Sequence, residues 1–429
     1  MRGVAEQAIA VRRDEAPAAA WSFAYFFCVL ASYYMLRPVR EAFGAAAGVE
    51  GLPWLFTGTF LAMLAAVPVF GALAARFPRR TLLPIICAFF IACILGLFVL
   101  LRSGAAAPWA PAAFFIWLSV FNLFVVSVFW SFMADVWHEE QARRLFGVIA
   151  AGGSAGALAG PALTAYLAGW LGPVNLLPIA AVVLAGALVC IVWLRRWASP
   201  LPLTLPSPPV GERVEEGPLG GSALGGITGL LRSSYLLAIC AFVALGTVLG
   251  TFIYFQQAQI VRAAYADPGQ RTAVFAAMDL AVNTLTIGAQ LFVTGRLAAR
   301  FGLSRLLAFL PALSLAGFTA LAIVPTAAVL IVYQVLRRAA TYGVTGPARE
   351  VLFTVLGRED KYKAKSVIDT VVYRGGDAAS GWLFAWLTAL GLGISGIAVV
   401  ALPLAIGWIA VALYLGRREE ALRHEGATT

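Results

Sequence analysis

Long apolar runs dominate this chain. Runs of about 18 residues or more recur along its whole length, which is the pattern of helices that cross a membrane. Apolar residues make up 61% of the sequence and charged residues only 12%, whereas a soluble domain carries about a quarter charged residues. The pattern therefore favours an all-α membrane protein and argues against a soluble enzyme.

The apolar runs predict about twelve transmembrane helices. We expect them near residues 21–43, 53–75, 81–101, 111–134, 145–170, 174–194, 234–256, 272–295, 303–324, 326–347, 364–390 and 392–415.

The basic residues predict the orientation of these spans. Most of the 31 Lys and Arg residues fall in the segments that share one side of the membrane with the N-terminus, and this bias marks the cytoplasmic side. Both termini are therefore expected in the cytoplasm, and the polar N-terminus has no cleavable signal pattern. The net charge of +10 is scattered over short loops and reflects topology, not nucleic-acid binding.

A segment rich in Pro, Gly and Ser divides the chain into two halves. It has no helical period and reads as a flexible cytoplasmic linker, either a passive tether or a regulatory segment. The expected organisation is an N-terminal tail, a six-helix bundle, the linker, a second six-helix bundle and a C-terminal tail, with boundaries at 1–20, 21–194, 195–232, 233–416 and 417–429.

An internal repeat supports the two halves. GALAARFPRRTLL (71–83) follows the second expected span, and GRLAARFGLSRLL (295–307) follows the eighth. Two parallel six-helix repeats are the plan of major facilitator transporters, with a site near mid-membrane. We expect residues at the cytoplasmic ends of the bundles to gate the transporter, namely Arg76, Arg80, Asp135 and Arg300.

Several stretches resemble known families. GALAARFPRR resembles the major facilitator signature loop, although Ala75 replaces its usual acid and Pro78 its usual glycine. LRPVREA (36–42), FWSFMADVWHEEQARRLFGVIAAGGS (129–154) and KYKAKSVIDTVVYRGGD (361–377) resemble the bacterial and plastid ATP/ADP translocases, the nucleotide exchangers of that superfamily. The resemblance implies a monomeric antiporter of the bacterial inner membrane that works by alternating access.

The resemblance also implies roles for particular residues. Arg40 and Glu41 fall where the translocases carry a substrate-critical Lys–Asp pair, and Lys363 or Lys365 matches a lysine tied to exchange. The stretches IWLSVFNLF and IYFQQAQ lack the acids that translocases carry in spans four and seven. These departures put ATP/ADP selectivity in doubt and leave anion transport intact.

Charges inside the apolar spans point to the substrate site, because a buried charge needs a cavity or a partner. Arg37, Arg40 and Glu41 share one helix face, as an anion clamp or as an interface salt bridge. Arg337 and Arg338 lie deep in span ten, facing the cavity or pairing with Asp279 or Asp369, and Arg374 is spaced to pair with Asp377. The full set of expected substrate-binding residues is Arg37, Arg40, Glu41, Asn122, Gln256, Gln257, Asp279, Arg337, Arg338, Lys363, Lys365, Asp369 and Arg374.

We expect a secondary transporter that moves a small organic anion, with a nucleotide first on the list. The alternative is a proton-coupled carrier or exporter of another metabolite, with Asp279 as the titrating group; a non-transporting membrane sensor has no supporting feature. The sequence contains no GK[ST] phosphate loop and no catalytic constellation, so no enzyme activity is expected. The five cysteines lie in apolar runs, and neither a metal nor another cofactor is expected.

Overall fold

The computed structural model of this chain describes residues 12, 15–76, 79–103, 108–198, 233–355, 365 and 367–427. Most of the expected linker lies outside the described residues, and so does Lys363. Two compact units emerge from the contacts within the chain. The first contains Met1–Phe43, Leu61–Glu216 and Ala266–Leu280, and the second contains Gly44–Phe60, Gly217–Tyr265 and Ala281–Thr429.

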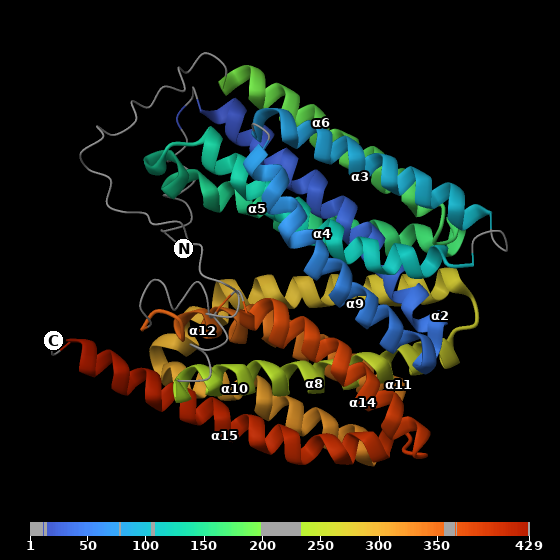
Figure 1. Cartoon of the computed structure of the whole chain (residues 1–429), viewed down its shortest axis with the longest axis vertical. Coiled ribbons are helices and arrows are strands. Elements are labelled where there is room, and N and C mark those ends of the chain that lie inside the picture. The colour runs from blue at the N-terminus through green and yellow to red at the C-terminus, as the bar shows by residue number, and fades with distance from the viewer. Residues whose placement is uncertain are drawn as a thin grey trace. The chain divides into compact units, whose positions relative to one another are not determined.

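The first long element, α2 (Ala16–Arg76), contains the first two expected spans as two helices that meet at a break (Figure 1). The break is at Gly48, whose φ of 72° lies in the left-handed region that glycine adopts without steric cost. We expected a loop between residues 43 and 53; the structure replaces it with this single kink.

In the first unit, α2 packs against α3 (Arg79–Arg102), α4 (Ala110–Val136), α5 (Glu139–Leu171) and α6 (Leu176–Ala198). Helices α3 and α6 lie side by side (Figure 1). Aromatic rings fill the core between α2 and α4: Phe26 stacks on Phe129 with ring centroids 4.0 Å apart. A long continuous apolar core therefore holds the transmembrane part of this unit together.

Glycines on α5 allow it to lie directly against the α2 backbone. A Cβ added at Gly152, Gly156 or Gly160 would stand 2.3–2.6 Å from the carbonyl oxygens of α2 residues. The AAGGSAGALAG stretch (150–160) is thus a small-residue face that replaces side-chain packing with close backbone contact.

The second unit is built from α8 (Ser234–Ala264), α10 (Gly295–Ile323), α11 (Ala327–Ala340), α12 (Gly346–Val351), α14 (Gly376–Ala389) and α15 (Ile394–Ala427). Helix α10 packs along α15 (Figure 1). Helix α9 (Pro268–Ala289) contributes residues to both units. A second left-handed glycine, Gly302, breaks α10 where the eighth and ninth expected spans meet.

Three π-helical segments interrupt the second unit, at Gln290–Thr294, Thr341–Thr345 and Ile368–Gly375. The first lies at the end of the eighth expected span, and the other two divide the tenth and eleventh expected spans into shorter pieces. Within the described residues, nine helices are long and apolar enough to cross a membrane, and the first of these includes two expected spans. The predicted all-α membrane fold with about twelve helices is confirmed.

Candidate substrate site

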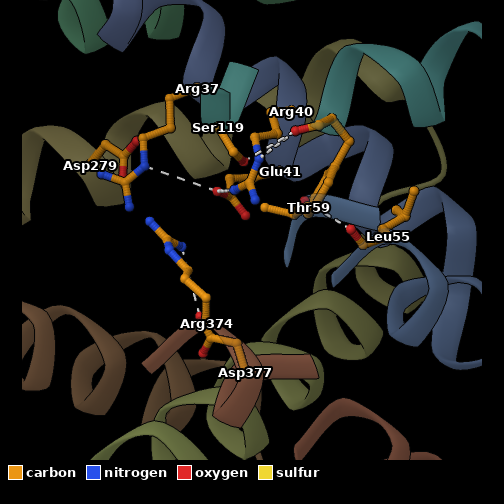
Figure 2. A network of polar contacts seen from close by, with 10 residues as sticks. Arg37, Arg40, Glu41, Leu55, Thr59, Ser119, Asp279, Arg374 and Asp377 are labelled. Atoms are coloured by element: carbon orange, nitrogen blue, oxygen red, sulfur yellow. Dashed lines mark hydrogen bonds and ion pairs between the residues drawn. The ribbon is translucent and has the colours of Figure 1, made fainter. Parts of the chain in front are cut away.

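Four charged residues of the first unit form a compact cluster near the middle of α2 (Figure 2). The guanidinium of Arg37 lies 4.0 Å from the Glu41 carboxylate and 3.7 Å from the Asp279 carboxylate, and Arg40 lies 2.9 Å from Glu41. Asp279 comes from α9, so the cluster ties α9 to α2. Two cations and two anions make it formally neutral.

Arg40 has local partners for much of its guanidinium. Its Nη1 donates to Glu41 Oε1 and its Nε donates to the Phe115 carbonyl oxygen at 3.2 Å. The guanidinium also lies over the Phe115 ring, 3.7 Å from the centroid. The salt bridge expected here is therefore present, and it uses the same guanidinium that an anion clamp would need. An anionic ligand on Arg40 would compete with Glu41 and the Phe115 carbonyl oxygen.

The carboxylates of this cluster are deeply buried. Glu41 is 6% exposed and Asp279 is 1% exposed. Glu41 Oε1 accepts from Arg40, while the described residues offer its buried Oε2 no hydrogen-bond donor. A buried carboxylate oxygen without a donor is costly, so this atom is a candidate to accept a hydrogen bond from a substrate.

Arg337 in the second unit has a different environment. Its Nε donates to Gln334 Oε1 at 3.1 Å, and among the described residues no carboxylate lies within ion-pair distance of it. Asp279 pairs with Arg37 and Asp369 pairs with Arg349 at 3.2 Å, so neither expected acid neutralises Arg337. This partly buried cation therefore lacks a counter-charge.

Three tyrosines and a glycine surround this guanidinium. Tyr333, Tyr342 and Tyr373 lie close enough to interact with it electrostatically. Tyr342 and Tyr373 belong to two of the π-helical segments, which often occur at functional sites. On α8, a Cβ added at Gly250 would stand 3.2 Å from Arg337 Nη1, so the glycine lets the guanidinium approach the α8 backbone.

Arg374 shares the neighbour Tyr373 with Arg337, and it has its own acid, Asp377 (Figure 2). Its Nη1 is 3.8 Å from Asp377, which confirms the pair expected from their spacing, and Asp377 also accepts from the Thr251 hydroxyl at 3.2 Å. Arg374 is thus partly neutralised, whereas Arg337 is not.

The two glutamines on α8 have different surroundings. Gln256 is fully buried and its Nε2 donates to the Ile394 carbonyl oxygen at 3.0 Å, which ties α8 to α15. Gln257 is only 3% exposed, and the part of the chain that the structure describes offers its Oε1 no hydrogen-bond donor. The Oε1 of Gln256 also has no donor among these residues, so Gln256 differs from Gln257 by the structural bond of its Nε2.

The remaining expected residues have varied surroundings. Arg338, partly buried on α11, lies close enough to Arg337 to interact with it electrostatically. Asn122 is partly buried on α4, and Arg300 and Asp135 are exposed. Lys365 pairs with Glu350. The side chains of Arg76 and Arg80 lie outside the described residues, so the gating prediction for them stays a prediction.

Two contributors were not identified from the sequence. Arg349 is not among the expected site residues, yet it pairs with Asp369. Gly250 carries no chemical signal, and only its distance to Arg337 reveals its role. The adjacent Arg and Glu in GPAREV are a sequence signal that could have identified Arg349. No sequence pattern marks Gly250.

Comparison with known proteins defines the class of this chain. The model of the Major Facilitator Superfamily matches residues 18–278, more than half of the 429 residues, and the chain belongs to this superfamily. It is therefore a secondary transporter, and the predicted class is confirmed. The family match does not single out the nucleotide exchangers. No curated protein matches the sequence.

Solved transporters share the fold at low identity. The POT family transporter PepTSo is 14% identical, with a TM-score of 0.64 over 95% of this chain and 98% of that one. The nucleoside transporter NupG is 11% identical, with a TM-score of 0.61 over 94% and 99%. A bacterial homologue of the human lysosomal transporter Spinster, inward-facing and unoccupied, is 13% identical, with a TM-score of 0.58 over 93% and 98%. At these identities the likeness concerns the fold alone.

Proposed function

We propose that this transporter carries a small organic anion and that Arg337 binds its anionic group. The observation that carries the proposal is the guanidinium of Arg337, which is partly buried in an apolar helix and has no carboxylate partner among the described residues. A charge inside a membrane is costly unless water, a partner or a ligand satisfies it. An oxyanion would supply the missing charge, and the neighbouring tyrosine hydroxyls would add donors to it.

A nucleotide remains the first candidate within this class. It is supported by the resemblance of LRPVREA and KYKAKSVIDTVVYRGGD to the nucleotide exchangers. The amides in IYFQQAQ, where those exchangers carry an acid, argue for a different selectivity. We therefore propose organic anion transport as the function and nucleotide exchange as its specific form to be tested.

Proton coupling is the second candidate, and Glu41 favours it. Among the described residues its Oε2 is buried without a hydrogen-bond donor, while Arg37 and Arg40 both lie against the same carboxylate. A proton on Glu41 would weaken its hold on Arg37 and Arg40 and free them for an anionic ligand. Loss of proton-driven uptake in Glu41→Gln, with exchange retained, is the expected result.

The substrate proposal is tested by ligand-induced thermal stabilisation of the purified protein. The probes are AMP, ADP, citrate, acetate and inorganic phosphate, each titrated against wild type, Arg337→Gln and Arg337→Lys. Removal of a charge-assisted contact costs about 1.5–3 kcal/mol, so Arg337→Gln should weaken binding about ten- to hundredfold. Arg337→Lys should recover only part of it, because the planar fork is lost.

Arg262→Gln is the matched control. Arg262 is also an arginine of the second unit, but it is exposed near the end of α8. It should leave binding unchanged. Stabilisation by any probe that persists at full strength in Arg337→Gln would exclude Arg337 as the anion-binding residue.

A further inference from the structure

Gln257 is buried, with only 3% of its surface exposed. Among the described residues, its Oε1 has no hydrogen-bond donor. The Oε1 of its neighbour Gln256 also has no donor there, but the Nε2 of Gln256 donates to α15 and so gives that side chain a structural role. A buried amide oxygen without a donor destabilises a protein, so the burial of Gln257 needs a reason other than packing.

Gln257 shares a face of α8 with the Arg337 contact. Gly250, which lies against the Arg337 guanidinium, and Gln257 are seven residues apart on α8. Seven residues make two turns, so both positions are on the same face. At 1.5 Å per residue they are about 10 Å apart along the helix axis. Within the described part of the chain, one face of α8 therefore has a cation without a carboxylate partner at one level and an amide oxygen without a donor two turns away.

We infer that Arg337 and Gln257 bind opposite ends of one elongated substrate. Arg337 takes the anionic group, as in the proposed function on which this inference rests. Gln257 takes a neutral polar group about 10 Å away, such as an amide, a hydroxyl or the polar edge of a heterocycle, because its side chain both donates and accepts hydrogen bonds. This sets the substrate class: an organic anion with a distal neutral polar group, larger than a simple carboxylate or phosphate.

Both side chains are largely enclosed in the described conformation. A substrate of this length reaches them only after the transporter opens, which agrees with alternating access. Because the substrate then supplies the amide's missing bonds, Gln257 is costly in the empty protein and useful in the loaded one.

The experiment compares a long probe with its anionic fragment. AMP is paired with inorganic phosphate, and N-acetylglycylglycine is paired with acetate. Affinities are measured by thermal stabilisation and by isothermal titration for wild type, Gln257→Leu, Gln257→Ala and Arg337→Gln. Gln259→Ala, on the same helix and only partly buried, is the matched control.

Gln257→Leu should weaken binding of at least one long probe about tenfold, which corresponds to the loss of one hydrogen bond to a buried group. The affinity for the anionic fragment of that probe should not change. Arg337→Gln should weaken both members of that pair. The empty Gln257→Leu protein should melt at the same or a higher temperature than wild type, because an unsatisfied amide is replaced by a similar apolar volume. A purely structural amide would instead lower the melting temperature.

Three results would overturn the inference. Equal losses for a long probe and its fragment in Gln257→Leu would make the effect indirect, and unchanged binding of both long probes would remove Gln257 from the site. Wild-type protein that binds none of the four probes would exclude the inference and the anion proposal together. If Arg337→Gln weakens binding as expected while the Gln257 variants bind like wild type, the proposed function stands and the inference that Gln257 binds the substrate is wrong.

Discussion

At the scale of single residues, three arginines in apolar helices show three ways to keep a cation in a membrane. Arg40 is held by an adjacent carboxylate, a carbonyl oxygen and an aromatic ring. Arg37 lies between two carboxylates at 3.7 and 4.0 Å. Arg337 has one neutral amide. Among these three, only Arg337 has no carboxylate partner in the part of the chain that the structure describes, so its environment most favours an anionic ligand.

The sequence predicted the ion-pair partners of some of these arginines and not of others. Helical spacing was enough to group Arg37 with Glu41 and Arg374 with Asp377, because residues three or four apart share a face. It could not choose between partners on other helices. The pairing of Asp279 with Arg37, and not with Arg337, depends on tertiary packing that no local pattern encodes.

Glu15 gives a pH-dependent prediction at this scale. Burial raises the pKa of its carboxyl, but the Gln141 and Arg144 side chains and the Arg12 backbone N–H donate to it and outweigh burial, so its pKa lies below the ordinary value of 4.5. A lowered pKa means that the stabilisation is complete above the unfolded value and is lost as pH falls through the folded one. Glu15→Gln should therefore lower the melting temperature at pH 7.

The difference between wild type and Glu15→Gln should shrink as pH falls below 4.5 and the wild-type carboxyl takes a proton. Melting curves recorded in detergent from pH 7 to acid conditions measure it. Glu50→Gln is the control, since Glu50 is exposed and should show no difference at any pH. A constant gap between wild type and Glu15→Gln at all pH values would contradict the assignment.

At the scale of elements, α5 packs against α2 through glycines, so that the two backbones touch without large side chains between them. A Cβ at Gly156 would stand 2.5 Å from the Phe27 carbonyl oxygen of α2, so Gly156→Ala must push α5 away from α2. We expect a loss of about 1–3 kcal/mol in the free energy of unfolding, the usual cost of overpacking. Chemical denaturation or thermal melting measures it.

Gly169 on the same helix provides the control for that prediction. A Cβ added there meets nothing within 4 Å. Gly169→Ala should be neutral or stabilising by up to about 1 kcal/mol, because alanine is the better helix former. If both substitutions cost the same, helix propensity and not packing between α2 and α5 would explain the loss.

The sequence predicted the number of membrane-spanning helices, but it did not predict where those helices are kinked or π-helical. Apolar runs located the helices because length and hydropathy decide what crosses a bilayer. The kink at Gly48 and the π-helical segments around Tyr342 and Tyr373 went unpredicted, because one extra backbone residue in a turn leaves no trace in hydropathy. Those irregular segments carry the side chains around Arg337.

At the scale of the whole molecule, the prediction that remains to be tested is orientation. The excess of Lys and Arg on one side predicts that both termini are cytoplasmic. Single cysteines introduced into a background without the five native ones distinguish the sides. Ser103, exposed after α3, and Asn175, exposed before α6, should be external, while Glu140, exposed at the start of α5, should be internal.

In intact cells, a membrane-impermeant maleimide should therefore label Ser103→Cys and Asn175→Cys and spare Glu140→Cys until the membrane is made permeable. The physical reason is that basic loops resist translocation, so each apolar helix inserts in the direction its flanking charges allow. Because successive helices cross the membrane in opposite directions, the side on which one loop lies fixes the side of every other loop. Three labelled positions therefore test the orientation more than once. If Glu140→Cys is labelled from outside and Ser103→Cys is protected, the orientation is the opposite of the predicted one, with the basic loops on the external side.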